Sequence, residues 1–149
     1  MSYYNGKLLY NVLSKGIQEL QLSNTNITDL VIQKDLSGWP NITVHEDKIY
    51  QTSLGGFVKC YTTKGEMLWE FKSTAQTRGI AVDKSGNVYV ALYERNYIAL
   101  ISPDGQSSRQ LEINPYKNAW GVLFNSLTNS LIVACLNGTV LLYDILCND

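Results

Sequence analysis

The sequence predicts an all-β fold, and three observations support this class. Val, Ile, Tyr and Thr are frequent and lie in short runs separated by Gly, Asn and Asp, the pattern typical of strands joined by turns. No segment shows a clear helical period, since the best candidate, residues 15–22, mixes helical and strand spacings over too short a run. A third observation is a strand-rich unit of about 40 residues that recurs along the chain, the repeat length of several β architectures.

The bulk composition indicates one globular domain. The chain has 149 residues, of which 45% are hydrophobic and only 17% are charged, so a substantial core is available. The 12 basic and 13 acidic residues form no run of like charge, which argues against a strongly charged nucleic-acid or membrane surface. The N-terminus lacks the apolar core of a signal peptide, and three scattered cysteines do not form a disulfide framework. We therefore expect a reduced, cytoplasmic protein with no membrane association.

The repeat is clearest in residues 79–91, which comprise a strand, a turn and a strand. Residues 41–52 and 121–134 align with this segment, so that Asn41, Gly79 and Gly121 are equivalent and lie 38 and 42 residues apart. A third strand follows each segment, and a fourth follows the first two after the turns Lys64-Gly65 and Asp104-Gly105. Four short strands in about 40 residues are typical of one β-propeller blade.

The ends of the chain interrupt this pattern. Strands predicted at residues 7–13, 16–22 and 27–32 form a first unit (3–36) whose own first strand is expected to be missing. Complete units span 37–76 and 77–117, and the last unit, 118–149, stops after a third strand. The sequence thus predicts one domain, 1–149, that is a partial β-propeller of about three and a half four-stranded blades. Because closed propellers usually have 4–8 blades, we expect part of a larger ring, self-association that completes a ring, or a strained four-bladed ring.

The middle unit resembles a known family. Residues 78–91, followed by a strand that ends in Ser102-Pro103-Asp104-Gly105, resemble the repeat of NHL-type, six-bladed TolB-like propellers. Residues 39–145 resemble the C-terminal half of the propeller in tripartite-motif proteins, especially those of invertebrate expansions. The resemblance implies a module of a ubiquitin ligase that recognises a protein substrate or RNA. It implies no catalytic residue in this chain, and three cysteines with one histidine cannot build the zinc sites of a RING.

Three features that could indicate chemistry favour structural roles instead. His45, the only histidine, is expected at a solvent-facing turn, away from Cys60. Trp69 lies in a stretch that resembles quinoprotein-type blades, where such a residue packs between blades. Propeller lactonases of the SMP-30 type place an Asp ligand before the repeat glycine, whereas this chain has Arg78 there. The sequence therefore predicts no catalytic residue, no cofactor and no metal ligand.

One face of the predicted propeller is the candidate binding surface. The loops from the fourth strand to the next first strand, and from the second strand to the third, share one face of a propeller. Aromatic and basic residues together suit protein hot spots and stacked single-stranded RNA. The candidate binding residues are Trp39, Arg78, Tyr93, Arg95, Asn96, Lys117, Asn118 and Trp120. The alternative is that Trp39 and Trp120 pack between blades and that the cations only solvate the loops.

Three functional hypotheses remain open from the sequence. The first is a non-enzymatic interaction or scaffold module that binds a protein partner, with RNA as a second candidate ligand. The second is a fragment of a propeller lactonase or hydrolase of the SMP-30 type. The third is a truncated gene product without an independent function, whose exposed strand edges would favour aggregation.

Overall fold

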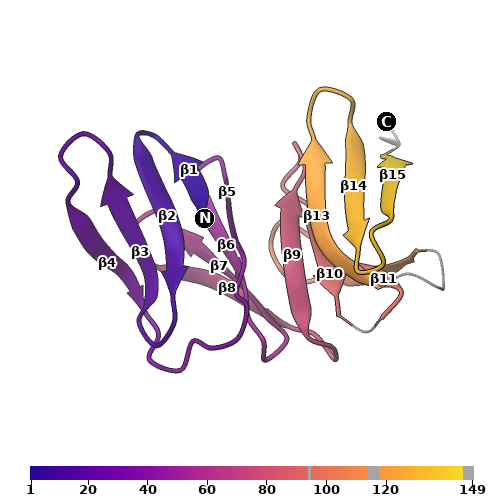
Figure 1. Ribbon diagram of the computed structural model, residues 1–149, viewed down its shortest axis with the longest axis horizontal. Helices are drawn as coiled ribbons and strands as arrows, with labels where there is room; N and C mark the ends of the chain where they lie inside the picture. Colours follow the sequence, from indigo (N-terminus) through magenta and orange to yellow (C-terminus); the bar gives the residue numbers. More distant parts are fainter. Residues whose placement is uncertain (94, 114–117, 146–149) are drawn as a thin grey trace.

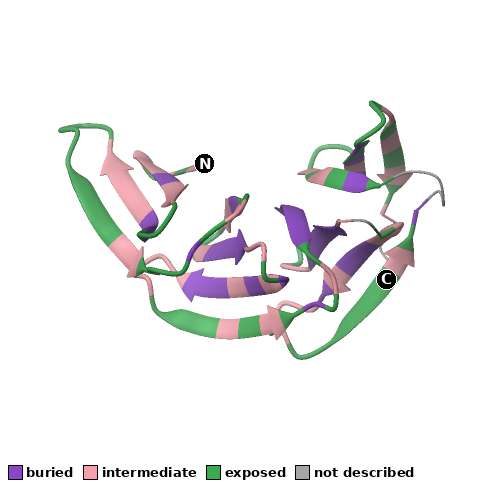
Figure 2. Ribbon diagram, turned by 60° about the horizontal axis from the view of Figure 1, so that its bottom comes forward, coloured by how far each residue is buried: buried purple, intermediate pink, exposed green. Residues whose placement is uncertain are grey.

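The computed structural model describes residues 1–93, 95–113 and 118–145, and every regular element in these ranges is a β-strand. The strands form four antiparallel sheets arranged in an open arc (Figures 1 and 2). No helix in this part of the chain is long and apolar enough to cross a membrane. The strands are β1 (Ser2–Tyr4), β2 (Lys7–Val12), β3 (Gly16–Gln21), β4 (Ile27–Ile32), β5 (Ile42–His45), β6 (Lys48–Thr52), β7 (Phe57–Thr62), β8 (Met67–Lys72), β9 (Thr77–Val82), β10 (Val88–Leu92), β11 (Tyr97–Ile101), β12 (Ser108–Glu112), β13 (Ala119–Asn125), β14 (Ser130–Cys135) and β15 (Val140–Asp144).

The sheet topology confirms the predicted partial propeller. Each sheet is a meander in chain order: β1 to β4, β5 to β8, β9 to β12, and β13 to β15. One strand differs from the prediction, because the first sheet has a first strand, β1, where none was expected. This strand is only three residues long and pairs Tyr3 with Leu8 and Tyr4 with Lys7. A strand this short has too few residues to show the alternation from which strands are predicted.

Burial follows the position of each strand within its sheet. All five residues of β10 are buried, because neighbouring sheets cover both faces of this middle-blade strand. By contrast, the fourth strands β8 and β12 contain only exposed and half-buried residues, since they lie on the outer side of the arc (Figure 2). The first strands lie on the inner side, where β9 contacts both β5 and β13.

The core consists of three apolar clusters, one between each pair of neighbouring sheets. Leu9 and Ile17 of the first sheet pack against Ile49 and Tyr61 of the second. A larger cluster joins the second and third sheets and contains Tyr50, Val58, Cys60, Val88, Val90 and Ile101. The third cluster places Tyr89 and Ile98 against Leu131 and Val133 of the last sheet. The arc is therefore stabilised by face-to-face burial between consecutive sheets.

Trp69 has the packing role that the sequence predicts. Its ring lies 6.0 Å from that of Tyr50, and its indole Nε1 donates a hydrogen bond of 3.1 Å to the carbonyl of Pro103 in the next sheet. Gly105, with φ +72°, fits against this indole, because a Cβ there would lie 2.5 Å from a ring carbon. The predicted Asp104-Gly105 turn thus also packs against the tryptophan of the neighbouring blade.

Candidate functional site

The candidate site begins at two equivalent irregularities in the inner strands. The pairing of β9 with β10 shifts register between Ile80 and Thr77, and that of β13 with β14 shifts between Gly121 and Ala119. Arg78 and Trp120 lie at these shifts, one residue before the equivalent glycines Gly79 and Gly121 of the repeat. A bulge turns the side chains of its residues away from the regular alternation, and here it sets the direction of both side chains.

The two glycines let β9 and β13 approach closely. A Cβ on Gly79 would lie 2.6 Å from the Cα of Gly121 and 2.7 Å from the amide nitrogen of Val122. A Cβ on Gly121 would meet only the Ala134 side chain, at 3.7 Å. The Cβ position of Gly79 is therefore directed at the backbone of β13, whereas that of Gly121 is not directed at β9. This approach brings the residues that precede the two glycines into contact as well.

Arg78 packs its guanidinium against two aromatic rings. The guanidinium carbon lies 4.7 Å from the ring centroid of Tyr93 and 4.7 Å from that of Trp120. The two rings meet edge to face, with centroids 5.8 Å apart and an interplanar angle of 81°. Stacking on aromatic faces is favourable for the flat, weakly hydrated guanidinium. The cluster joins the third sheet, the β10–β11 loop and the last sheet.

The guanidinium is buried but incompletely hydrogen-bonded. Arg78 is only 6% exposed. Its Nη2 donates to Gln76 Oε1 at 3.5 Å, whereas Nε and Nη1 have no acceptor among the described residues. An unpaired buried donor is costly, and more so when it is charged. The arginine therefore retains unused capacity to bind an acceptor.

Arg78 forms part of the wall of a cavity of about 450 Å³. Residues from all four sheets or their loops line it, and Arg78 is the only charged one among them. Asn11 is fixed in this wall because its amide donates to the Pro40 carbonyl at 3.1 Å and accepts from Gln51 Nε2 at 2.7 Å. The lining residues are Asn11, Leu13, Gly38, Trp39, Pro40, Asn41, Arg78 and Trp120.

The structure brings together four of the eight predicted binding residues. Trp39, Arg78 and Trp120 line the cavity, and Tyr93 contacts two of them. Arg78 itself lies on β9 and is buried, so it is not a cation that solvates a loop. Trp39 is 69% exposed, which excludes the alternative that it packs between blades, while Trp120 is 40% exposed and does both.

The other four residues lie apart from the cavity or cannot be placed. Arg95 and Asn118 are exposed on loops of the same face, and Asn96 is half-buried, its carbonyl accepting from Ile113 N at 2.8 Å. None of these three lines the cavity. Lys117 lies outside the described residues. A role of any of the eight residues in binding stays a prediction.

Sequence analysis missed the polar network that supports the cavity. Gln51, only 1% exposed, exchanges amide hydrogen bonds of 2.9 and 3.0 Å with Gln33, which also donates to the Tyr61 hydroxyl at 3.0 Å. Together with the bond from Gln51 to Asn11, this network joins the first two sheets. The only sequence feature that pointed to it was a glutamine that follows Ile49 and Tyr50 in a predicted strand.

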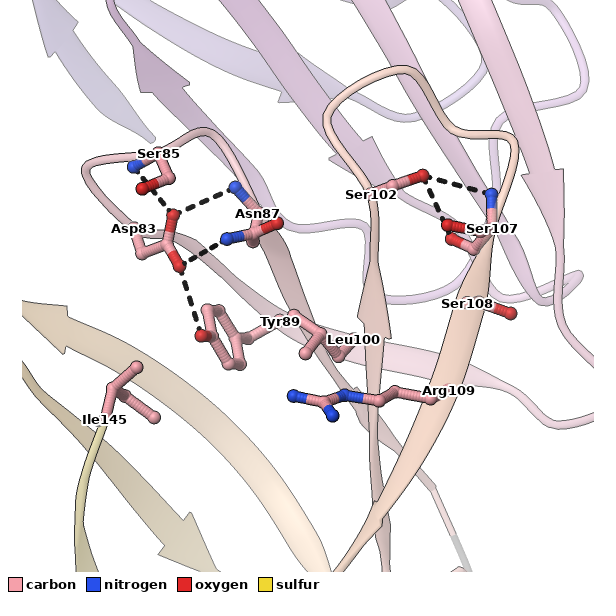
Figure 3. Close-up of a pocket in the computed structure, with 10 residues that line it drawn as sticks. All are labelled: Asp83, Ser85, Asn87, Tyr89, Leu100, Ser102, Ser107, Ser108, Arg109 and Ile145. Atoms are coloured by element: carbon pink, nitrogen blue, oxygen red, sulfur yellow. Dashed lines mark hydrogen bonds between the residues drawn. The ribbon is translucent and has the colours of Figure 1, made fainter. Parts of the chain in front are cut away.

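A second cavity, of about 580 Å³, lies at the opposite end of the third sheet (Figure 3). Asp83 projects into it, but its carboxylate accepts hydrogen bonds from Ser85 N, Asn87 N and Asn87 Nδ2, each at 2.9 Å, and from the Tyr89 hydroxyl at 3.1 Å. These bonds close the β9–β10 turn. The Asp83 carboxylate therefore stabilises this turn. The described residues contain no group of three or more potential metal ligands.

Cys60 and His45, the two residues that could have formed a nucleophile and base, have separate surroundings. Burial raises the pKa of the Cys60 thiol to about 11, so it is protonated near neutral pH and poorly nucleophilic. Its hydrogen-bond partner is Tyr50. The prediction that His45 faces solvent is wrong in part: the residue is half-buried and its Nε2 is buried without a hydrogen-bond partner among the described residues. Strand β5 packs against the neighbouring β9 there, which a single turn motif does not reveal.

Comparison with known proteins supports the propeller fold. A family model described as a β-propeller repeat matches residues 71–91. The chain is similar to the β-propeller domain of Cps50 (Swd1) from Myceliophteria thermophila, with a TM-score of 0.77 and 12% identity over 95% of this chain. It is also similar to the computationally designed proteins Ika4 (TM-score 0.74, 12% identity, 97% of this chain) and Ika8 (0.72, 13%, 96%). No curated protein matches the sequence.

The chain covers different shares of these three structures. The chain spans 50% of the Swd1 propeller domain and 44% of the Ika8 chain, but 88% of the Ika4 chain. At 12–13% identity, these similarities show the fold alone.

Proposed function

We propose that this chain is a non-enzymatic interaction module that binds an acidic segment of a protein partner in the cavity around Arg78. The observation that supports this proposal is the buried guanidinium, which contacts the Tyr93 and Trp120 rings and has two nitrogens without an acceptor among the described residues. The established part is a β-propeller, a fold whose loop faces commonly bind other molecules.

The chemistry of the cavity favours a carboxylate flanked by apolar groups. A guanidinium can donate two parallel hydrogen bonds to a carboxylate, and here two aromatic rings contact the group. Trp39 and Trp120 expose apolar rings beside it, and aromatic residues near an arginine are typical of binding hot spots. Because Nε and Nη1 are buried in the unbound chain, hydrogen bonding to them requires neighbouring side chains to move.

A protein partner fits this face better than RNA does. Single strands bind along grooves that carry several cations, whereas Arg78 is the only charged residue lining this cavity. The net charge of −1 adds no general attraction for a polyanion. The resemblance of residues 39–145 to the C-terminal half of tripartite-motif propellers supports a more specific proposal, namely recognition of a ligase substrate.

Peptide binding tests the proposal directly. The probes are a fluorescein-labelled pool of Asp- and Glu-containing peptides with interspersed Leu, a matched Asn and Gln pool, and a random single-stranded RNA pool. We expect the acidic pool to bind best, and Trp39→Ala to weaken binding about tenfold through loss of an exposed anchor. Arg78→Lys, which keeps the charge but not the planar fork, should weaken it similarly.

Matched controls separate this face from the rest of the molecule. Lys84→Ala removes an exposed cation from the β9–β10 turn at the other end of the third sheet and should leave binding unchanged. Equal binding of the acidic and amide pools, or preferential binding of the RNA pool, would contradict the proposal. Thermal melts of each variant show whether weaker binding follows from loss of fold.

We also propose that the chain has no hydrolase activity and acts in the cytoplasm. The bound state of Asp83 and the raised pKa of Cys60 support the first point. The free thiol of Cys60 supports the second, because oxidising compartments favour disulfides. Lactone hydrolysis that requires an added divalent cation would contradict the first point. Recovery of the native protein from a secretory fraction would contradict the second.

A further inference from the structure

The last sheet exposes an apolar face at one end of the arc. Leu123, Ile132 and Leu142 are in register across β13, β14 and β15, and Leu123 and Leu142 are 60% and 67% exposed. Beside them, Val140 is 64% exposed. These residues point away from the third sheet, because the alternate residues Leu131, Val133, Leu141 and Tyr143 pack against it.

The first sheet exposes a second apolar face at the other end. Tyr3, Leu8, Leu20 and Ile27 are in register across all four of its strands. Tyr3 is 66% and Ile27 is 60% exposed. They point away from the second sheet, which is packed by the alternate residues Tyr4, Leu9 and Ile17. Each end of the arc therefore carries an apolar sheet face that no described residue covers.

The repeat shows that these faces are the two halves of one kind of interface. Ile132 is equivalent to Tyr50 and Tyr89, which are 1% and 2% exposed because the following sheet covers them. In the same register, Leu8 is equivalent to Ile49 and Val88, both 0% exposed beneath the preceding sheet. Among the described residues, no sheet covers these positions of the last sheet from the following side, or those of the first sheet from the preceding side.

The geometry points to a second copy of this chain as the occupant of both faces: two arcs close head to tail into one ring. Each copy would pack its first sheet against the last sheet of the other, around a two-fold axis. The chain spans about half of the Swd1 propeller domain and of Ika8, so one further arc of the same size completes a ring of that extent. The chain also covers 88% of Ika4, so a similar fold occurs in a designed chain of nearly the same length.

A second copy satisfies a condition that an unrelated partner does not meet. The two exposed faces are different surfaces at opposite ends of the arc (Figure 2). A partner that covers both must itself present one face of each type, separated by the same arc. A copy of the chain has that property by construction, and closure by a two-fold axis leaves neither face open to form fibres.

The mass in solution and a pair of complementary variants test this inference. Sedimentation should give twice the 16.7 kDa of one chain. By equivalence with Leu100 and Tyr143, which share the third cluster, Leu142 of one copy should lie near Leu20 of the other. Leu20→Asp alone and Leu142→Lys alone each place an unpaired charge in both interfaces of a two-copy ring, and should weaken self-association about a hundredfold.

Mixing the two variants distinguishes a ring from other dimers. A ring with one copy of each variant has one interface that pairs Asp with Lys and a second interface that is wild type, so the mixture should regain the double mass. In a dimer that joins two first sheets or two last sheets, one of the single variants would keep the double mass, and this result would overturn the inference. A monomeric wild-type chain would overturn it too, and would assign closure to further blades of a longer polypeptide or to another protein.

Leu127→Lys is the matched control. Leu127 is 94% exposed in the β13–β14 turn, outside both faces, so its substitution should leave the mass unchanged. Far-ultraviolet circular dichroism of each variant should match that of the wild type, because every substituted leucine is at the surface or at the end of the arc. Higher oligomers of the wild type, with no discrete double mass, would contradict a closed two-copy ring.

Discussion

Substitution of Gly79 by alanine should destabilise the arc at its inner strands and disturb the candidate site. The added Cβ would lie 2.6 Å from the Cα of Gly121 and 2.7 Å from the Val122 nitrogen. Carbon atoms in contact are normally about 3.5–4.0 Å apart, so β9 and β13 must separate by about 1 Å. The obstacle is backbone, which cannot turn away as the end of a flexible side chain can.

The magnitude follows from overpacking in a fitted core. Added methyl groups in well-packed interiors cost about 1–3 kcal/mol in free energy of unfolding. For a chain of this size, about 2 kcal/mol corresponds to a melting temperature lower by roughly 4–8 °C. Separation of the strands would also move Arg78 relative to the Trp120 ring, which it now meets at 4.7 Å. A change in tryptophan fluorescence of the folded variant should accompany the loss of stability.

Gly121→Ala is the matched control for this prediction. The same chemical change at the equivalent position of the next blade would meet only Ala134, at 3.7 Å, an ordinary contact. It should leave stability unchanged or raise it by about 0.4–1 kcal/mol, since alanine lowers the entropy of the unfolded chain. Urea unfolding of both variants measures the difference. Equal stabilities of the two variants would refute the one-sided close approach of β9 to β13.

Three further predictions concern the interior. Trp69→Phe removes a 3.1 Å hydrogen bond to a carbonyl of the next sheet and should cost about 1–2 kcal/mol in urea unfolding; an unchanged midpoint would contradict this contact. Asp83→Ala removes the carboxylate that accepts from the Tyr89 hydroxyl and from two turn amides, and should cost about 2–4 kcal/mol, whereas Asp83→Asn should cost less; equal losses would argue against the hydrogen-bonding role. Burial raises the pKa of Cys60 from 9.0 to about 11 and that of Tyr61 from 10.0 to about 12, so the folded chain keeps protons that the unfolded chain releases. The stability that these two groups contribute should therefore be constant well below pH 9 and fall as the pH rises from 9 to 12, and a flat urea midpoint over that range would contradict the burial of both groups.

The fold was predictable because the same pattern of strands and turns occurs in several successive units of the sequence. Strand positions recur at equivalent places, and each turn shows favoured residues such as Asp104-Gly105. Composition alone could not reveal β1, whose three residues pair with β2 only because the first sheet has a free inner edge. The position of Trp69 between blades followed from its place in the repeat. That Gly105 makes room for its indole required the three-dimensional arrangement.

The candidate site was predictable only in part. Loop topology places Trp39, Tyr93 and Trp120 on one face, and this much follows from strand order. The burial of Arg78 does not follow, because it depends on a register shift in β9 and on the close approach of two glycines from different blades. Long-range contacts of this kind leave no local pattern in one sequence. Asn11 entered the site for the same reason, through a hydrogen bond to Gln51 forty residues away.

The cavity can form within one copy of the chain, whereas the exposed faces at the ends of the arc need a second copy to cover them. One copy supplies every lining residue of the cavity, from Asn11 of the first sheet to Trp120 of the last. The exposed faces at Leu20 and Leu142, in contrast, are covered only when another arc is present. A variant such as Leu20→Asp should therefore lose the double mass and still bind the acidic peptide pool. Loss of both properties together would show instead that the cavity takes its shape from the closed ring, because packing at the ends would then set the distance between Arg78 and the surrounding rings.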